Sequence, residues 1–495
     1  MYRLAIVVFA FLLVIQTQAK YEDQYGTDFG NRIKRVTRGQ DFKVIWGRNG
    51  SSAYVFRGIM VYDSKQGDLV EVIEDVRQWR ENQALMQKFP DIRPGPNRAD
   101  GRYVYVAPLG NKIIFNITGF PDPYGASHGG GMEAWVADFG DIGLTTARPV
   151  PAEATGMNCY VLCIGLDVNT GKQWAYYTDT YDTGNMIRRF NIDNLSEDEL
   201  VVERQKGRYG FRNFAGISAD LNELVASHGD GALYYDLASG NDAINLKSQP
   251  DGEPVGTCNI TISPDDEKNA FWIGKYGYNT GGTEGGPHSA IATNTDLLNV
   301  NTRVDHLIPN DPVFLEKMIA NPSASTNTAI CTQWAFDRKK CRVGTYVAWY
   351  KCAGRKNNPC SGKDPRATVV RFNDDLTEIE DFEQFIPASM DNKTITHGRP
   401  HMWIYPDVVN VGRELVGRAR IGFEIAVSKG TIAFTAGAPG LVEIDLVAAN
   451  GALAASRRSA NSDRIVINRS RLRAGMYFMS IKINGVQVGR KLIML

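Results

Sequence analysis

Three of the six histidines in this chain stand in Gly-rich segments that could present an imidazole to solvent. They are His128 in the segment SHGGG, His228 in the segment SHGDG, and His288 after the segment GGP. Imidazole changes charge near neutral pH and commonly binds metals, so three on one surface could act as acid or base or hold an ion. The structural alternative is that histidine and glycine suit tight turns with positive φ. No carboxylates that would orient a metal-bound histidine are visibly paired with them.

Three tyrosines in polar segments are the second set of candidate ligand-binding residues. Tyr276 and Tyr278 lie in the segment YGYNTGGTEGGP, and Tyr124 lies in the segment PDPYG. Exposed tyrosine rings flanked by Asn and Gly would suit stacking on a sugar. Trp403 and Tyr405 stand in a strand-like segment instead, and we expect aromatic residues there to belong to the core.

The chain lacks the sequence motifs of common enzyme classes. It contains no GxSxG, no HExxH, no P-loop, no GxGxxG between a strand and a helix, and no Ser-x-Asp-x-Gly-x-Thr-Trp box. His397 and His401 have a metal-like spacing, but the glycine and proline between them exclude a helix. In a strand the two would lie about 13 Å apart, too far for one ion. We therefore predict neither a cofactor nor a bound metal, and whether the protein is an enzyme stays open.

Short strands joined by turns would position these residues. The segment from Phe214 to Gly240 reads as three strands, with a Ser218-Ala-Asp220 turn after the first and a turn from Asp236 to Gly240 after the third. One such meander cannot bury both its faces, so several must stack. Copies of the opening are Asn97–Val106, Cys258–Trp272, Trp334–Ala348 and His401–Asp407; copies of the closing turn begin at Asp63 and Asp167, with degraded ones near Asp193, Asn294 and Asn373.

These repeats resemble the TolB-like and WD-repeat-like β-propellers, whose blades open with a Ser-Pro-Asp-Gly-type turn and carry an Asp-x-x-Thr-Gly hairpin on the third strand. Here Ser263-Pro-Asp-Asp266 matches the first feature and Asp167-Val-Asn-Thr-Gly171 the second. The repeats are about 45 to 70 residues apart, so the resemblance implies six or seven blades. If the histidine turns join second to third strands, they emerge on one rim.

Bulk composition fits this interpretation. The chain has 55 basic and 55 acidic residues, so no global charge favours a nucleic acid. Its 49 Gly and 21 Pro suit an all-β protein with many turns. Helical periodicity is confined to Val76–Phe89 and Asp311–Ala320. Residues 20–40 show no periodicity, and we interpret them as a leader or as a strand that closes the propeller ring.

The first residues have the features of a secretory signal peptide. Arg3 precedes the apolar segment Leu4–Ile15, and Thr17-Gln-Ala19 provides a cleavage site with small residues. No later apolar segment is long enough to predict a transmembrane helix. We expect a mature protein that is secreted or held at the cell surface, outside the outer membrane.

The seven cysteines all follow this segment, which fits an oxidising compartment and leaves one of them unpaired. Cys159 and Cys163 stand in one strand, about 13 Å apart, so they cannot bond to each other. We expect at least one disulfide among the later four: Cys331, Cys341, Cys352 and Cys360.

From about Phe423 the pattern changes to short alternating strands, which predict a small antiparallel β-sandwich over residues 423–495. The strands are expected at Thr431–Phe434, Val442–Leu446, Arg464–Ile467, Met476–Ile483 and Arg490–Leu495.

Four features of this segment carry a second resemblance: the segment VEIDLVAANG from Val442, the strand LRAGMYF from Leu472, the dipeptide Asn484-Gly485, and Arg490 before a terminal aliphatic run. They resemble the type A C-terminal sorting domain of the bacterial type IX secretion system. The resemblance implies Sec-dependent export and then passage through the outer membrane, with the type IX machinery as partner. The alternative is an ordinary C-terminal sandwich.

The predicted fold class is thus all-β: a signal peptide at 1–19, a six- or seven-bladed β-propeller at 20–422, and a C-terminal sandwich at 423–495. The predicted function is a secreted or cell-surface binding propeller, with a polysaccharide or another cell-envelope component as ligand. The alternative is a secreted hydrolase or lyase that uses the rim histidines, with or without a metal.

Overall fold

The computed structural model describes residues 25–48, 56–76, 100–120, 131–150, 159–178, 186–203, 211–228, 231–240, 243–245, 259–265, 270–274, 289–293, 327–337, 342–350, 366–374, 379–385, 397–406, 423–427, 431–436, 441–448, 452–460, 465–468, 472, 476–483 and 486–494. They form two compact units. The first contains the described parts of Met1–Leu166 and Gln173–Tyr405, and the second contains Asp167–Lys172 and the described parts of Pro406–Leu495.

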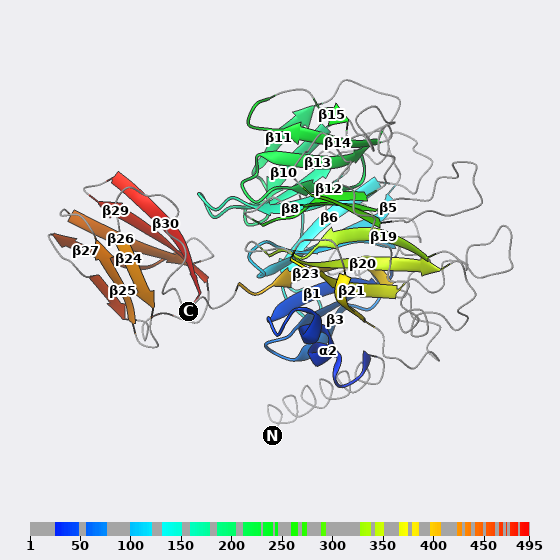
Figure 1. The fold of residues 1–495 in the computed structure, drawn as a ribbon, viewed down its shortest axis with the longest axis horizontal. Helices are drawn as coiled ribbons and strands as arrows, with labels where there is room; N and C mark the ends of the chain where they lie inside the picture. Colours follow the sequence, from blue (N-terminus) through cyan, green and yellow to red (C-terminus); the bar gives the residue numbers. More distant parts are fainter. Residues whose placement is uncertain are drawn as a thin grey trace, which may run out of the picture. The chain divides into compact units, whose positions relative to one another are not determined.

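The described residues of the first unit form six antiparallel sheets (Figure 1). From first to last strand, sheets 1 to 6 are β23-β1-β2-β3, β4-β5-β6-β7, β8-β9-β10-β11, β12-β13-β14-β15, β16-β17-β18 and β19-β20-β21-β22. The strands are β1 (Phe42–Arg48), β2 (Gly58–Asp63), β3 (Asp68–Ile73), β4 (Asp100–Val106), β5 (Lys112–Phe120), β6 (Gly131–Asp138), β7 (Arg148–Pro149), β8 (Tyr160–Leu166), β9 (Gln173–Thr178), β10 (Met186–Asn191), β11 (Asp198–Glu203), β12 (Phe211–Ile217), β13 (Glu223–His228), β14 (Gly231–Asp236), β15 (Ile244–Asn245), β16 (Asn259–Ile262), β17 (Ala270–Gly274), β18 (Ser289–Thr293), β19 (Asn327–Trp334), β20 (Val343–Tyr350), β21 (Arg366–Phe372), β22 (Ile379–Gln384) and β23 (His397–Ile404).

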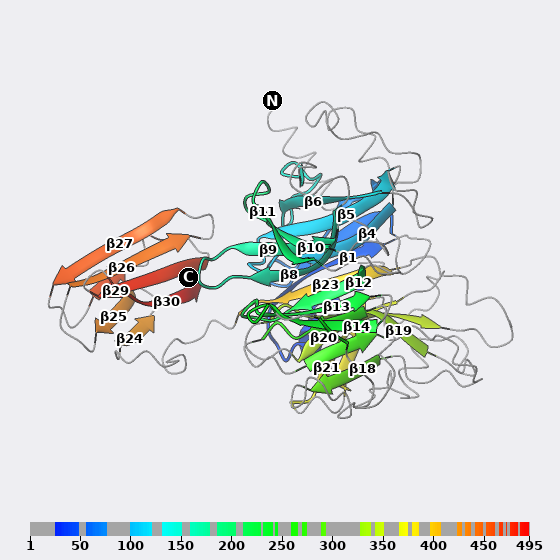
Figure 2. The ribbon, with the colours of Figure 1, turned by 90° about the horizontal axis from the view of Figure 1, so that it is seen from above.

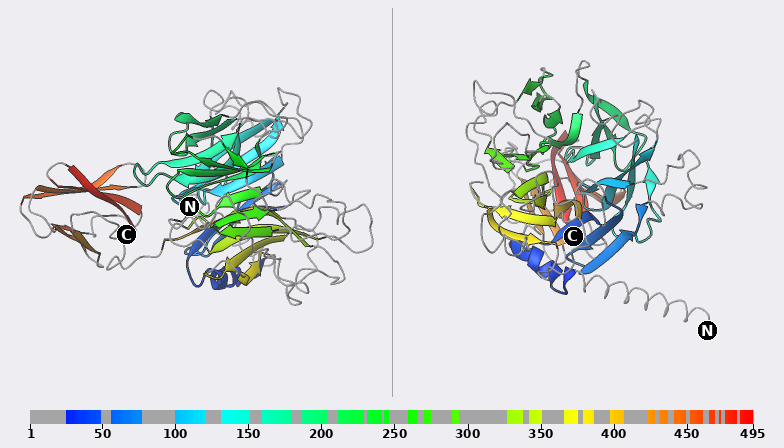
Figure 3. Two further views of the ribbon diagram at one scale, coloured as in Figure 1. Left: turned by 45° about the horizontal axis from the view of Figure 1, so that its top comes forward. Right: turned by 90° about the vertical axis from the view of Figure 1, so that its right-hand side faces the viewer.

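The first strands of these sheets meet in a closed ring. β23 contacts β4, β8 contacts β12, β12 contacts β16, β16 contacts β19, and β19 contacts β23. The remaining junction is made by the hydroxyl of Tyr105 in β4, which donates to the carbonyl oxygen of Leu162 in β8 at 2.9 Å. The right-hand view of Figure 3 shows the sheets around a common centre. The unit is a β-propeller, which confirms the predicted fold class, and its described sheets number six.

The ring closes by pairing the two ends of the propeller segment. β23 pairs antiparallel with β1, with Val44 opposite Met402 and Lys43 opposite Trp403, and the two strands lie side by side in Figures 1 and 2. Sheet 1 therefore takes one strand from near residue 400 and three from before residue 74. The expectation that a strand within residues 20–40 closes the ring is wrong.

The repeated opening turn is held by its own side chains. After β12, the Ser218 hydroxyl donates to Asp220 Oδ1 at 2.7 Å and accepts from the Glu223 amide at 2.9 Å. In sheet 5, Ser263 donates to Asp265 Oδ1 at 3.2 Å in the same way. These turns follow the first strands of their sheets, as the repeat predicted, because serine and aspartate satisfy the backbone locally.

The closing turn follows the third strand in sheets 1 and 4, after Asp63 and Asp236, where Gly67 and Gly240 have φ of +75° and +65°. The turn that begins at Asp167 has the same chemistry, since Asp167 Oδ1 accepts from the Asn169 amide at 2.8 Å. It joins β8 to β9, however, the first and second strands of sheet 3. The predicted position is wrong there, because an aspartate-capped turn fits any tight connection.

Close packing between sheets 1 and 2 depends on three glycines around one ring. Phe56 is fully buried and bridges to Gly101 in β4. A Cβ at Gly47, Gly101 or Gly398 would lie 2.1, 2.0 or 2.8 Å from an atom of the Phe56 side chain. No larger side chain fits those positions unless the ring moves.

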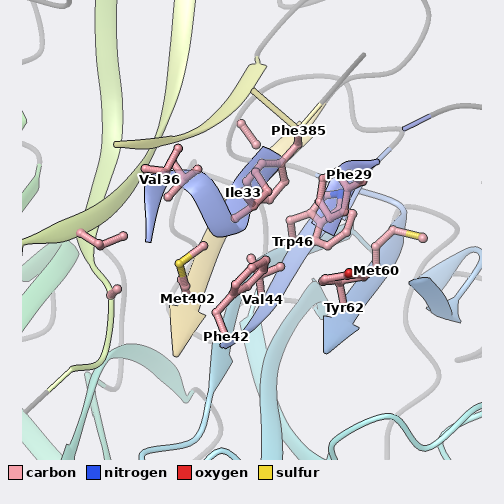
Figure 4. Packing of buried hydrophobic residues seen from close by; sticks show 14 of the residues in the cluster. Phe29, Ile33, Val36, Phe42, Val44, Trp46, Met60, Tyr62, Phe385 and Met402 are labelled. Carbon is pink, nitrogen blue, oxygen red and sulfur yellow. The ribbon is translucent and has the colours of Figure 1, made fainter. Parts of the chain in front are cut away.

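A helix precedes the propeller strands. α2 (Phe29–Val36) buries Phe29, Ile33 and Val36 on one face, at the i, i+4, i+7 spacing of an amphipathic helix. Figure 4 shows these side chains packed beside Trp46 of β1 and Phe385, which follows β22. The expectation that residues 20–40 lack periodicity is wrong, because the helix is short and Arg, Lys and Asn separate its apolar residues. The helix predicted at Asp311–Ala320 lies outside the described residues, as does all but Val76 of the other.

The second unit contains two antiparallel sheets, β24-β25-β28 and β27-β26-β29-β30. Buried residues of both sheets share one core, which includes Phe434, Ile444, Ile467, Met479 and Ile481. This is the predicted small sandwich; its first strand and β27 were not expected. The strands are β24 (Phe423–Val427), β25 (Thr431–Ala436), β26 (Leu441–Ala448), β27 (Leu453–Ala460), β28 (Ile465–Asn468), β29 (Met476–Ile483) and β30 (Val486–Met494).

The two cysteines at the start of sheet 3 are buried free thiols, so the prediction that they do not bond to each other is confirmed. Burial raises the pKa of both Cys159 and Cys163. The expected disulfide among the later cysteines stays a prediction, since Cys341, Cys352 and Cys360 lie outside the described residues.

Candidate functional site

Strand order gives the propeller two different rims. The first strands begin at one rim, at residues such as Tyr160 and His397, and we call this the loop rim. The first strands end at the other rim, which we call the turn rim. In an antiparallel sheet, the second-to-third connection and the link to the next sheet both leave from the loop rim. The β3–β4 connection there takes residues 74–99, whereas the β2–β3 turn on the turn rim takes residues 64–67. Long connections on a rigid scaffold are where binding residues usually lie.

The six candidate residues all belong to second-to-third connections or their ends. His228 is the last residue of β13 and pairs with Gly231 of β14 and Phe211 of β12. Tyr124 and His128 lie in the sequence between β5 and β6, and Tyr276, Tyr278 and His288 lie between β17 and β18. These five residues are outside the described part of the chain. All three histidines fall in, or at the end of, second-to-third connections of sheets 2, 4 and 5. That their segments meet on one rim stays a prediction.

Beneath the loop rim, a buried layer joins the first strands of sheets 1, 2 and 3. The guanidinium carbon of Arg399 in β23 lies 3.7 Å from the ring centroid of Tyr103 in β4. The Tyr103 ring lies 4.5 Å from that of Tyr160 in β8, and the Tyr160 hydroxyl donates to the Tyr103 hydroxyl. Asn116 in β5 donates to the carbonyl oxygen of Cys159 at 2.7 Å. These contacts fix three strand ends at the base of the rim.

Sequence reasoning did not find this layer. Arg399 is 1% exposed, and its cation–π contact with Tyr103 stabilises a buried charge. The available signal was an arginine inside a strand, between Gly398 and Pro400. An arginine in a strand indicates that its charge has a partner within the protein, but it does not identify a tyrosine of another blade as that partner.

His401 belongs to the core rather than to the site. Its Nδ1 accepts from the Val106 amide at 3.0 Å, and its ring centroid lies 5.3 Å from that of Tyr105. Burial lowers the pKa of His401 to about 3, so the imidazole is neutral near pH 7. The residue therefore links sheets 1 and 2.

A polar network occupies the turn rim between the same two sheets. Lys43 Nζ donates to the Gly110 carbonyl at 2.7 Å, and it lies 3.6 Å from Asp63 and 4.5 Å from the Phe139 ring. The Tyr405 hydroxyl donates to Asp63 Oδ2 at 2.8 Å. Burial lowers the pKa of Lys43, and burial together with the Asp63 carboxylate raises the pKa of Tyr405. Every one of these groups contacts protein, so the network acts as a tie between sheets.

The described residues contain no group of three or more His, Cys, Asp or Glu side chains arranged to hold a metal. No described helix is long and apolar enough to cross a membrane. Within this part of the chain, the polar clusters therefore stabilise the ring, and the candidate ligand-binding residues belong to the connections of the loop rim.

No protein-family model matches the chain. No curated protein matches it either. Several solved structures do. A putative 6-phosphogluconolactonase from Bacteroides fragilis is 11% identical, covers 87% of this chain and 99% of its own, and has a TM-score of 0.32. A putative TolB from Agrobacterium tumefaciens is 9% identical, covers 74% and 99%, and has a TM-score of 0.33. Kluyveromyces lactis Hsv2 is 10% identical, covers 84% and 99%, and has a TM-score of 0.29. The chain is similar to these proteins at a level that assigns no activity.

Replacing His401 tests its neutral, buried state. In His401→Gln the amide oxygen can still accept from Val106 but cannot take up a proton. Below the unperturbed pKa of 6.5, the unfolded wild-type chain binds a proton that the folded protein refuses until about pH 3. The stability that His401 contributes is therefore present above pH 6.5 and lost as pH falls, by at most about 1.4 kcal/mol per pH unit.

Urea unfolding of the propeller, followed at several pH values between about 6.5 and 4, gives the comparison. The free energy of unfolding should fall more steeply with decreasing pH in the wild-type protein than in His401→Gln. Parallel pH profiles would mean that His401 titrates normally in the folded state.

Proposed function

We propose that this protein is an exported binding propeller that holds its ligand at the loop rim. The observation that carries the proposal is topological: the segments with Tyr124, His128, Tyr276, Tyr278 and His288 all connect second to third strands, and His228 ends such a strand. Segments from sheets 2, 4 and 5 can then contribute to one surface around the central axis. A rigid ring with variable connections suits binding.

The proposed ligand is a polysaccharide or another carbohydrate of the cell envelope. Tyrosine presents a large flat ring with a hydroxyl that can donate a hydrogen bond, which suits the apolar face and polar edge of a sugar. Asparagine, threonine and glycine surround Tyr276 and Tyr278 in the sequence. The buried layer of Arg399, Tyr103 and Tyr160 supports the proposal indirectly, because it keeps the base of the rim rigid.

We further propose export through the type IX secretion pathway. The signal peptide predicted at residues 1–19 and the resemblance of the C-terminal residues to a sorting domain support this route. The C-terminal sandwich has β29 and β30 paired, with Ile483 opposite Val486. Only Asn484 and Gly485 stand between those residues, which suits a two-residue hairpin.

The enzymatic alternative is a hydrolase or lyase that uses His128, His228 and His288. The one observation in its favour is that all three histidines belong to loop-rim segments of the ring. Three imidazoles converging on the axis could bind a transition metal.

Glycan-array binding by the full mature chain tests the proposed ligand class. A carbohydrate that binds the wild-type protein should bind Tyr276→Ala/Tyr278→Ala about tenfold or more weakly, because two stacking rings are lost. Ile142→Ala is the matched control: Ile142 is 61% exposed on the turn rim, and its loss should leave binding unchanged.

Two results would contradict this account: no binding to any glycan, or equal loss of binding in the Ile142→Ala control. Elemental analysis of the same protein addresses the alternative. One equivalent of a transition metal that disappears in His128→Ala/His228→Ala/His288→Ala would favour the enzyme over the binding protein.

Cell fractionation tests the export route in a bacterium that has a type IX machinery. The full chain should reach the cell surface or the medium, and a chain ending at Gly422 should stay in the periplasm. If the shortened chain leaves the cell as efficiently as the full one, the C-terminal sandwich is not a sorting domain. The binding experiment uses purified protein, so its outcome is independent of this one.

A further inference from the structure

The α2 helix lies across the junction between the sheet that closes the ring and the sheet before it. Its residues Phe29 and Ile33 share a buried cluster with Trp46 and Tyr62 of sheet 1 and with Phe385 beside sheet 6. The Phe29 ring centroid lies 5.8 Å from that of Trp46 and 5.7 Å from that of Phe385. The rings of Trp46 and Phe385 also contact each other, with centroids 5.1 Å apart, and Figure 4 shows Phe29 and Ile33 beside them. The helix therefore covers a seam between two blades.

Three arginines of this segment pair with carboxylates of β22, the outermost strand of sheet 6. Arg32 Nη1 lies 2.8 Å from Glu383, and Arg38 Nη2 lies 2.7 Å from Glu380. Arg35 pairs with both Asp381 and Glu383. The arginines follow at i, i+3 and i+6, and β22 has the sequence IEDFEQ, so a basic edge meets an acidic strand.

Sheet 6 also binds the end of the helix. Arg371 in β21 donates through Nη1 to the carbonyl oxygens of Arg35 at 3.1 Å and Val36 at 2.8 Å. A cation there binds the C-terminal carbonyl groups of the helix, where the Arg35 carbonyl also accepts from the Arg38 amide at 3.1 Å. Hydrogen bonds from Arg38 and Arg371 hold the pKa of Glu380 below its usual value.

The pairing that closes the ring does not involve this segment. The β23–β1 ladder runs from Phe42 to Arg48, beyond the end of the helix. An eight-residue helix is too short to be stable alone in water, so α2 is either docked on the seam or unfolded. Arg35 and Arg38 are half-exposed, with side-chain exposures of 53% and 52%, so salt can screen their ion pairs.

We propose that residues 25–38 form a releasable strap, which locks sheet 1 to sheet 6 and can detach while the β23–β1 ladder stays intact. Detachment uncovers Trp46 and Phe385 and leaves the outer edge of β22 without its cover. The strap is thus a conformational device at the seam between sheet 6 and sheet 1, the sheet in which the two ends of the propeller segment pair. This inference does not depend on the proposed ligand or on the export route.

Hydrogen exchange of the full chain, read by peptide mass spectrometry, tests the strap. In Arg32→Glu/Arg35→Glu, peptides covering residues 29–38 and 379–385 should exchange about tenfold faster, while β1, β13 and β14 keep their wild-type rates. The matched control is Arg458→Glu, which removes the ion pair with Glu443 in the second unit and should not affect these peptides. Adding Asp381→Arg and Glu383→Arg to the double variant should restore slow exchange.

Two outcomes would overturn the proposal. Unchanged exchange in Arg32→Glu/Arg35→Glu would mean that the ion pairs do not hold the helix, and equally faster exchange in all six sheets would mean that the strap cannot detach on its own. If that variant does not fold, the wild-type protein gives the answer. Raising NaCl from about 0.05 to 1 M should speed exchange in residues 29–36 relative to β13, and no such difference would refute the strap.

Discussion

The antiparallel pairing of β23 with β1 is the contact on which the rest of the propeller depends. It joins residues near 400 to residues near 45, so a single ladder closes the ring of six described sheets. Each sheet alone has two apolar faces, and only a closed ring covers them all. The side chains on the two faces of β23 reflect this: Met402 packs into the cluster with sheet 6, and Trp403 donates through its indole to the Pro108 carbonyl beside sheet 2 at 2.8 Å.

Closure of the ring also limits which polar groups can contact a ligand. Once the ring is shut, the polar groups between blades are satisfied by other blades, as His401 is by Val106 and Lys43 is by Gly110. Such groups hold the scaffold and are not free for a ligand. The loop rim differs because its long connections are additional to the strands that form the ring. The same closure brings the start of the chain to the last blade, where α2 packs on sheets 1 and 6.

Local chemistry made much of this fold predictable from sequence. The turns at Ser218 and Asp236 were predictable because their side chains bond to their own backbone. That the histidine segments share one rim was a conditional inference from strand order, and it stays a prediction. The helix α2 was missed because its burial depends on Trp46 and Phe385, one nearby and one far along the chain. Arg399 was missed for a similar reason, since a charge in a strand does not identify the tyrosine ring that it contacts. The roles of Tyr124, Tyr276 and Tyr278 in ligand binding stay predictions.

A pair of cysteines placed across the closing ladder tests ring closure most directly. Val44 lies opposite Met402, and directly opposed Cβ atoms in an antiparallel pair are close enough for a disulfide. Peptide mass spectrometry of oxidised Val44→Cys/Met402→Cys should find the 44–402 link in high yield. Val44→Cys/Ile404→Cys, two residues out of register, should not form its link. Absence of the first link, or equal yield of both, would contradict a propeller closed by β23 and β1 in this register.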